Sequence, residues 1–323
     1  MKDMKLGMIG TNFVSDWLAE SAEKTDGITV TAIYSRSEET GAAFARKHSI
    51  GAVYTDMDEF LSSDIDAVYI ASPNALHFSQ AEAAMRHSKH VLLEKPAALT
   101  EADFRKLADI AKEEGVVLLE AMRPAHDPVI REAREKLSLL GTLRHAVFEF
   151  CQYSSRYDRF KNGEIMNAFD PKLGNAAVMD IGVYAIHLCV MMLGRPDSVE
   201  ADSFMLPNGM EGMGKARLKY GSMTAEIVYS KIYDSVSPSY VTGENGSVVI
   251  GKLSTGDDVF LKLRKEEAVR LGGERPENNM VYELLDFVSA VRGELDISEF
   301  TENTRTTLAV IDRIREIGGI RFD

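Results

Sequence analysis

The chain has 323 residues, 45% of them hydrophobic, and carries 50 acidic against 37 basic side chains, for a formal net charge of −13. This apolar content can bury one or two cores without disulfides, so we expect two domains. The negative charge opposes general attraction to nucleic acid and to anionic membranes, and it favours a small-molecule ligand.

The cysteines and the amino terminus predict a cytoplasmic protein. Cys151 and Cys189 lie in apolar stretches without the spacing of a zinc site or a Cys-x-x-Cys motif, which predicts buried thiols and no metal centre. The amino terminus enters a strand without an apolar signal-like region. We also expect no membrane-spanning helix, because no apolar run approaches the roughly 20 residues that such a helix needs.

Strand and helix patterns alternate through the first 120 residues. The periodicity predicts strands at 5–9, 29–34, 53–54, 66–71, 91–93 and 116–120, separated by helices at 14–22, 38–47, 58–61, 77–88 and 100–114. Strands that alternate with helices imply right-handed crossovers and a doubly wound parallel sheet. The sequence therefore predicts an α/β domain of this class over residues 1–121.

After Ala121 the strands follow one another, joined by Gly, Asn and Asp turns. They are predicted at 143–153, 199–206, 215–220, 223–229, 247–250 and 259–263. One apolar helix at 176–193 interrupts them, and amphipathic helices at 281–291 and 302–317 end the chain. Consecutive hairpin-like strands predict a second α/β domain over residues 122–323 with a mainly antiparallel sheet.

The first strand turns into the first helix in a loop that carries only part of a glycine fingerprint. In a dinucleotide-binding fold this turn seats the pyrophosphate on helix amides. Only Gly10 of Gly-x-Gly-x-x-Gly is present, because Asn12 and Ser15 stand at the other glycine positions. Asn tolerates a left-handed backbone and Ser is small, so the loop can still form, although a plain strand-helix turn explains it equally well. The predicted nucleotide contacts here are Gly10, Thr11, Asn12 and Phe13.

The second strand ends in Tyr34-Ser35-Arg36-Ser37. NAD-preferring folds carry a carboxylate near this position to bind the ribose hydroxyls, and this chain has none. A guanidinium between two hydroxyls suits the 2′-phosphate of NADP through charge-assisted hydrogen bonds. Ser37 can at the same time cap the next helix. We therefore predict NADP ahead of NAD, with contacts from Ser35 and Arg36.

Polar residues also follow the fourth strand, at the same carboxyl rim of the predicted sheet. These are Ser72, Pro73 and Asn74, with His77 in the first turn of the next helix. The helix dipole disfavours a cationic histidine at that position, so a neutral hydrogen-bonding role is expected for His77. Simple helix initiation is an even alternative. We place all four among the candidate cofactor-binding residues.

Lys95 is the first catalytic candidate. It follows a buried strand that ends with Glu94, at the rim where open α/β sheets bind ligands. Pro96 restricts the backbone of Lys95 to extended or turn geometry. An ordinary solvated lysine is the alternative, and the neighbouring motifs favour the catalytic interpretation. Glu94 and Lys95 are also predicted to contact the cofactor.

A second polar group lies on the apolar helix predicted at 176–193. At about 100° per residue, Asp180, Tyr184 and His187 share one helix face. They either satisfy one another in the core or line a cleft, and we favour the cleft. Arg156 and Tyr157 follow a strand end where polar and aromatic residues are concentrated, as in sugar sites. We predict Arg156, Tyr157 and His187 as substrate contacts.

Taken together, these motifs resemble the glucose-fructose oxidoreductase/inositol dehydrogenase/MocA (Gfo/Idh/MocA) family. The resemblance implies an amino-terminal Rossmann domain and a carboxyl-terminal α/β domain whose open sheet forms homodimers or homotetramers. It also implies hydride transfer between NAD(P) and a sugar, polyol or related alcohol. The motifs occur in the family's order: Gly10-Thr11, Ser35-Arg36, Ser72-Pro73-Asn74 with His77, Glu94-Lys95-Pro96, and Asp180-Ile181-Gly182-Val183-Tyr184.

Residue roles follow from the same resemblance. It implies that Lys95 contacts substrate and nicotinamide ribose, often beside a cis Lys-Pro bond, and that Tyr184 is the catalytic acid/base. Inositol dehydrogenases have a histidine near this turn, and His187 stands one helical turn further along. Asn12 and His90 depart from the family pattern, because each replaces a usual glycine.

The expected chemistry is hydride transfer to or from the carbon of a secondary alcohol or carbonyl. Tyr184, whose ordinary pKa of about 10 a nearby Lys95 would lower, supplies the proton, and Lys95 stabilises the developing alkoxide. Asp180 orients this pair or binds a substrate hydroxyl. Two alternatives are a glycosidase of the same fold that uses NAD catalytically and a cofactor-sensing regulator without catalysis. Arg36 disfavours the first, and the pair of Lys95 and Tyr184 disfavours the second.

Overall fold

A computed structural model describes residues 3–322, which form two compact units. Unit 1 consists of three segments, namely the described residues up to Ala98, Ala102–Met122 and Pro276–Glu302. Unit 2 takes Leu99–Glu101, Arg123–Arg275 and the chain from Asn303 on. The sequence analysis had placed all residues after 121 in the second domain, so the return of the chain at Pro276 differs from that prediction.

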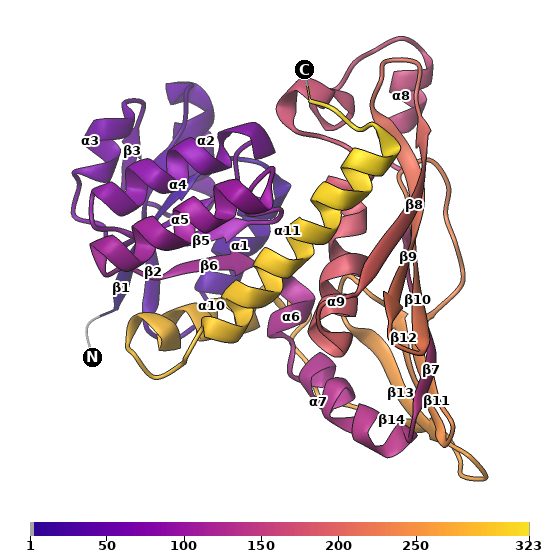
Figure 1. Ribbon diagram of the computed structural model, residues 1–323. Coiled ribbons are helices and arrows are strands. Elements are labelled where there is room, and N and C mark those ends of the chain that lie inside the picture. Colours follow the sequence, from indigo (N-terminus) through magenta and orange to yellow (C-terminus); the bar gives the residue numbers. More distant parts are fainter. Residues whose placement is uncertain (1–2, 323) are drawn as a thin grey trace. The chain divides into compact units, whose positions relative to one another are not determined.

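Unit 1 contains a six-stranded sheet in the order β3-β2-β1-β4-β5-β6 (Figure 1). All of its strand pairs are parallel. The order reverses between β1 and β4, and ligands of such sheets bind at the carboxyl ends of the strands at this reversal. The predicted doubly wound parallel sheet is confirmed. Its strands are β1 (Met4–Ile9), β2 (Ile28–Tyr34), β3 (Ala52–Tyr54), β4 (Ala67–Ile70), β5 (His90–Glu94) and β6 (Leu118–Ala121).

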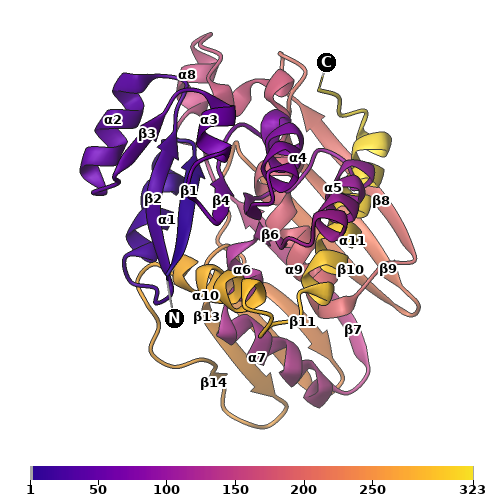
Figure 2. The same ribbon diagram turned by 90° about the vertical axis from the view of Figure 1, so that its left-hand side faces the viewer.

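Helices cover the sheet of unit 1 (Figure 2). They are α1 (Phe13–Ala22), α2 (Glu38–Lys47), α3 (Met57–Leu61), the short 3₁₀ turn η1 (Asn74–Leu76), α4 (His77–Arg86), α5 (Glu101–Glu114) and α10 (Met280–Val291). The late helix α10 packs against α1, and its residues Met280, Leu284 and Phe287 are fully buried in the same core as β1. This apolar packing explains why residues 276–302 belong to unit 1.

Unit 2 contains an eight-stranded sheet in the order β14-β13-β12-β11-β7-β10-β9-β8. Most neighbours are antiparallel, as predicted, but β7 and β10 pair in parallel, so the sheet is mixed. The short strands β11 and β14 were not predicted. The strands are β7 (Leu143–Cys151), β8 (Ser198–Met205), β9 (Glu211–Tyr220), β10 (Met223–Ser230), β11 (Ser239–Gly243), β12 (Gly246–Lys252), β13 (Asp257–Leu263) and β14 (Val269–Arg270).

One face of this sheet packs against helix, and the other is open. Helix α9 contacts β7 and β10. Within residues 3–322 no helix covers the opposite face (Figure 1). The other elements with residues in unit 2 are α6 (Arg123–His126), α7 (Pro128–Lys136), η2 (Leu137–Leu140), α8 (Tyr157–Lys161), η3 (Asn167–Phe169), η4 (Pro171–Leu173), η5 (Val178–Gly182), α9 (Val183–Leu193) and α11 (Ser298–Gly318), which begins in unit 1.

The predictions for the apolar segment just after the middle of the chain need two corrections. The regular helix predicted at 176–193 is instead a π-helical turn, η5, followed by α9. In addition, Pro171–Leu193 is long and apolar enough by composition to cross a membrane, which the sequence analysis had excluded. Because 83% of its apolar window is buried inside the protein, this segment has the burial of a core helix.

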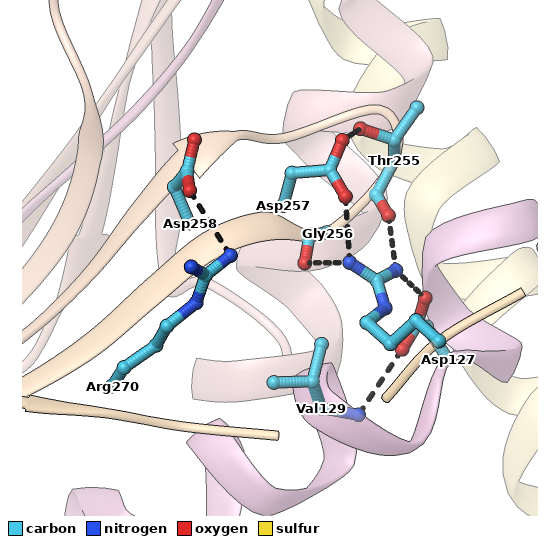
Figure 3. Close-up of polar contacts among 8 residues, drawn as sticks. Asp127, Val129, Thr255, Gly256, Asp257, Asp258 and Arg270 are labelled. Carbon is cyan, nitrogen blue, oxygen red and sulfur yellow. Dashed lines mark hydrogen bonds and ion pairs between the residues drawn. The ribbon is translucent and has the colours of Figure 1, made fainter. Parts of the chain in front are cut away.

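A cluster of ion pairs and hydrogen bonds, not foreseen from the sequence, lies at one end of unit 2 (Figure 3). The Arg275 guanidinium pairs with Asp127 and with Asp257 (Nη1–Oδ1 2.7 Å), and it donates to two backbone carbonyls of the turn between β12 and β13. Asp127 has no exposed surface, and its Oδ1 accepts the Val129 N–H at the start of α7. The cluster therefore ties this turn to α7.

Candidate active site

The loop after β1 depends on Gly10 and Asn12. Gly10 has φ +109°, and a Cβ there would lie 2.7 Å from the carbonyl oxygen of Ala71, so only glycine fits. Asn12 caps α1 by accepting the N–H groups of Val14 and Ser15, and its Nδ2 donates to Ala71 (2.8 Å). Asn12 is extended (φ −90°), so the left-handed backbone considered for it is not used. The loop is thus closed without the second glycine.

Thr11 and Phe13 flank this cap. Thr11 is half-buried, whereas the Phe13 side chain is 53% exposed at the first position of α1. Its ring makes an edge contact with Trp17, the single tryptophan of the chain, at a centroid distance of 5.2 Å. An exposed aromatic pair therefore stands beside the helix amino terminus that is predicted to face the pyrophosphate.

The end of β2 leaves one cation exposed. Ser37 caps α2, since its Oγ accepts the Thr40 N–H (3.3 Å), and the buried Ser35 Oγ accepts the Ser37 N–H (3.3 Å). Arg36 is exposed, and within residues 3–322 its guanidinium has no hydrogen bond or ion pair. The interpretation of Ser37 as a helix cap is therefore confirmed, and the binding of a 2′-phosphate by the exposed Arg36 stays a prediction.

The loop after β4 lies at the same carboxyl rim. Ser72, Pro73 and Asn74 are half-buried, and η1 begins at Asn74. The Ser72 hydroxyl donates to Oε1 of Gln80 in α4 (2.6 Å). Each of the three residues retains exposed surface, so the structure leaves them accessible to a nucleotide.

His77 is buried at the carboxyl rim of the sheet. It is 1% exposed, with Nδ1 2.9 Å from the carbonyl oxygen of Pro96 and Nε2 3.0 Å from that of Ser72. Burial lowers the pKa of His77, although the two carbonyls oppose this shift. A neutral imidazole has a single N–H and donates to one of them. Its burial favours a role in holding the two loops, and direct cofactor contact stays a prediction.

Lys95 lies in a turn whose neighbouring residues are fixed by hydrogen bonds. The peptide bond that follows it is cis, and its side chain is half-buried. Before it, the buried Glu94 accepts the Tyr69 hydroxyl (2.6 Å). After it, Ala97 N–H donates to Oε1 of Glu120 on β6 (2.9 Å). These two hydrogen bonds hold the residues on either side of Lys95, whose half-buried side chain lies at the carboxyl end of β5.

In unit 2, Asp180 and Tyr184 occupy the π turn and the first turn of α9. The Asp180 side chain is 37% exposed, and Tyr184 is half-buried with an edge contact to Phe150 (5.6 Å between ring centroids). A π turn has more residues per turn than the regular helix assumed in the sequence analysis, and such turns are frequent at functional sites. Both residues retain exposed surface in unit 2, so they are not enclosed in its hydrophobic core.

His187 is buried, unlike Asp180 and Tyr184. It is 2% exposed, and its Nδ1 lies 3.4 Å from the Thr307 hydroxyl. Burial lowers the pKa of His187 to about 3, and the nearby His126 adds to the shift. The imidazole is therefore neutral at physiological pH. This burial favours a structural role, and the predicted substrate contact stays untested.

Two buried charged residues support the π turn, and the sequence analysis missed both. Lys231, 2% exposed, places its Nζ 2.7 Å from Oδ2 of Asp180. Glu211, with no exposed surface, accepts the Val178 N–H that opens η5 (2.8 Å). The Tyr229 hydroxyl also donates to Glu211 (2.9 Å). No local pattern marks a strand-end Lys or Glu as buried, so only the tertiary structure reveals them.

The predicted substrate residues Arg156 and Tyr157 begin α8. Arg156 is exposed. Tyr157 is half-buried and stacks on Phe160 and Phe169 at ring-centroid distances of 6.1 and 5.7 Å. The aromatic cluster fixes the Tyr157 ring, whereas the Arg156 guanidinium faces solvent.

Comparison with known proteins identifies the family. Residues 4–122 match the model of the oxidoreductase family with an NAD-binding Rossmann fold, and residues 130–249 match the GFO/IDH/MocA C-terminal domain. The chain is 39% identical to scyllo-inositol 2-dehydrogenase (NADP(+)) IolU of Bacillus subtilis, over 99% of this chain and 98% of that protein. The chain belongs to the Gfo/Idh/MocA oxidoreductase family.

Further Gfo/Idh/MocA relatives agree with this assignment. The uncharacterized oxidoreductase YgjR of Escherichia coli is 37% identical over 99% of this chain and 98% of its own length. KijD10, a 3-ketoreductase from Actinomadura kijaniata whose structure contains TDP-benzene and NADP, has a TM-score of 0.84 over 98% of each chain. At 22% identity that likeness shows the fold alone. The predicted family, fold class and NAD(P)-dependent oxidoreductase activity are confirmed.

The rim of unit 1 fits the cofactor of a Gfo/Idh/MocA oxidoreductase. Gly10 allows the loop to close on Ala71, α1 offers a helix amino terminus, and Arg36 offers an exposed cation. Gly10, Thr11, Phe13 and Arg36 would hold NADP, whose nicotinamide supplies or accepts the hydride when bound. The roles of the individual residues remain predictions.

The buried Glu211 gives this Gfo/Idh/MocA protein a pH-dependent stability. Burial raises the pKa of Glu211 to about 7 from its ordinary value near 4.5. Between these values the folded chain binds more protons than the unfolded chain, so stability falls as pH rises through this window. We expect the free energy of unfolding of Glu211→Gln, relative to wild type, to increase by about 3 kcal/mol from about pH 5 to about pH 8.

Urea unfolding at the two pH values measures this difference. Glu164→Gln is the control, because Glu164 is an exposed surface glutamate paired with Arg159. A Glu211→Gln stability difference that is the same at both pH values would show that Glu211 titrates normally in the folded protein.

Proposed function

We propose that this protein is an NADP-dependent dehydrogenase that transfers hydride between nicotinamide and a secondary alcohol carbon of a cyclic polyol or sugar. The observation that carries the proposal is the 39% identity, over nearly the full length of both chains, to a scyllo-inositol 2-dehydrogenase that uses NADP(+). Two features of the chain support it: the exposed Arg36 after β2, and Asp180 and Tyr184 on the surface of unit 2.

Each of the proposed residues has one task. Tyr184 gives a proton to the substrate oxygen in reduction and accepts it in oxidation. The Lys95 ammonium stabilises the negative charge that develops on this oxygen. The Asp180 carboxylate accepts a hydrogen bond from a substrate hydroxyl that does not react, and Arg156 with Tyr157 completes the contacts to the ring.

Steady-state turnover tests the proposal. The protein is incubated with NADP⁺ and, one at a time, scyllo-inositol, other inositol isomers and aldoses, and the absorbance of reduced nicotinamide is followed. We expect NADPH to form with at least one cyclic polyol or sugar and to form much more slowly with NAD⁺. The absence of turnover with every polyol and sugar in either direction would refute the proposed substrate class.

Cofactor choice gives a specific prediction for Arg36. Arg36→Ala removes the guanidinium proposed to bind the 2′-phosphate, and a hydrogen bond to a charged group is worth about 1.5–3 kcal/mol. We expect the NADPH dissociation constant to rise about 10- to 100-fold and that of NADH to change little. Isothermal titration calorimetry measures both. Arg46→Ala, which removes an exposed guanidinium from the other end of α2, is the control. Equal losses for both nucleotides would contradict the prediction.

The open face of unit 2 supports the proposed homo-oligomer. Val147, Tyr240, Val249 and Phe260 lie opposite one another on the adjacent strands β7, β11, β12 and β13, so they form one apolar row across the sheet. All four are half-buried, and charged residues flank the row on the neighbouring strands. A second copy of this chain would cover the row in a self-complementary interface.

Oligomer size tests this interface. We expect wild type to have at least twice the monomer mass by light scattering after size-exclusion chromatography, and Tyr240→Glu to halve it. Leu139→Glu, at an exposed leucine of η2, should leave the mass unchanged. A monomeric wild type, or a Tyr240→Glu variant of unchanged mass, would count against the proposed interface.

The proposed setting is the cytoplasm. Cys151 and Cys189 are free thiols, and burial raises their pKa values to about 11 and about 12, which leaves both as unreactive thiols. Two cysteines that form no disulfide suit a reducing compartment. Recovery of the native protein in the membrane or extracellular fraction of its own cells would refute the proposal.

A further inference from the structure

Lys231 is buried where a lysine is rarely found. It follows the last residue of β10 and is 2% exposed. Its main chain is fixed on both sides, because its N–H donates to the carbonyl of Gly212 (2.9 Å) and its carbonyl accepts the N–H of Ser154 (2.9 Å). The side chain therefore leaves a rigid point between β9 and the loop that leads to α8.

The ammonium of Lys231 connects three segments of unit 2. Nζ lies 2.7 Å from Oδ2 of Asp180 in the π turn and donates to the carbonyl oxygen of Ala168 in η3 (2.8 Å). It also lies 5.0 Å from the centre of the Phe169 ring, which favours a cation. The Phe169 ring in turn stacks on Tyr157. One cation thus links the Asp180 carboxylate to the aromatic cluster beside Arg156.

Asp180 and Lys231 differ in their access to solvent. The Asp180 side chain is 37% exposed, whereas that of Lys231 is 2% exposed. The ammonium therefore contacts the carboxylate from the protein side, and part of the Asp180 side chain is exposed to solvent. A buried cation is costly unless it is paired, and a buried ion pair can often be replaced as a whole by apolar residues of similar size without loss of stability. This cost favours a role for Lys231 beyond stability.

We propose that Lys231 is a positioning residue for substrate recognition. It keeps Asp180 ionised and oriented toward a hydroxyl of a polyol or sugar, and it holds η3 and the Tyr157 cluster in register with that carboxylate. This inference rests on the proposed function, because the polyol is the ligand that Asp180 receives. Lys231 acts through Asp180 and touches neither the hydride nor the proton that is transferred.

A double-mutant cycle tests this coupling. We expect Lys231→Met and Asp180→Asn each to lower kcat/KM for the polyol about 100-fold, chiefly through KM for the polyol, with KM for NADP⁺ within about twofold of wild type. The double variant should lose no more than either single variant, because both changes remove one ion pair. Lys106→Met, which removes the exposed partner of Asp103, should match wild type.

The outcomes separate the inference from the proposed function. Wild type without polyol turnover refutes both. Wild type with turnover and a double variant whose loss is the product of the two single losses refutes the role of Lys231 alone. If Lys231→Met does not fold because the Asp180 carboxylate loses the Lys231 ammonium, the double variant also removes the charge of that carboxylate. Its kcat/KM should then equal that of Asp180→Asn, and a further tenfold loss would overturn the inference.

Discussion

Lys95→Ala should lower kcat by about 1000-fold while the NADPH dissociation constant changes less than about threefold. Loss of one preorganised donor to a developing oxyanion typically costs about 100- to 1000-fold in kcat. Nucleotide binding should survive, because Gly10, Arg36 and the α1 amino terminus do not depend on this side chain. Steady-state kinetics with the best polyol, together with calorimetric NADPH titration, measures both quantities.

The control for Lys95 is Lys112→Ala, which removes an exposed lysine near the end of α5. It should leave both kcat and the NADPH dissociation constant unchanged. A Lys95→Ala variant with wild-type kcat would remove Lys95 from the chemistry. Equal losses in turnover and in NADPH binding would instead assign Lys95 to the cofactor site.

Tyr184→Phe is the second large effect. It removes the phenol proposed as proton donor and acceptor, and general acid-base catalysis contributes typically about 100- to 10,000-fold. We expect kcat to fall about 1000-fold, with KM for the polyol and for NADP⁺ within about threefold of wild type. The edge contact of the ring with Phe150 does not need the hydroxyl, so the variant should fold normally.

Tyr220→Phe is the matched control for this hydroxyl. Tyr220 also lies in unit 2, and its hydroxyl is 3.4 Å from Sγ of Cys189 in a partly buried contact. Its loss should affect stability only slightly and leave kcat intact. A Tyr184→Phe variant with more than a tenth of wild-type kcat would show that another group moves the proton.

The sequence could predict the architecture because its signals are local. Strands and helices that alternate through residue 121 show their own periodicity, and the rim motifs at Ser72 and Lys95 follow directly from strand ends. Elements that depend on distant partners were harder to predict. Helix α10 was recognised as a helix, but its place in unit 1 depends on packing against α1, more than 250 residues earlier in the chain. The parallel pair of β7 and β10 is equally non-local.

The same distinction applies to the site. Asp180 and Tyr184 were found because they interrupt an apolar helix, yet regular helical geometry also placed His187 with them, and the structure buries it beside Thr307. Lys231 and Glu211 gave no local signal. A charged residue at a strand end is usually solvated, and only the folded sheet brings these two under the π turn.

Transfer of deuterium tests the central claim most directly. The protein is incubated with NADPH deuterated at nicotinamide C4, in both stereochemical forms, and with the ketone corresponding to the best polyol substrate; the product is then examined by NMR and mass spectrometry. The account predicts one deuterium on the newly formed carbinol carbon from one of the two forms. A polyol formed without deuterium from either form, or a reducing sugar released with no net NADPH consumption, would contradict it.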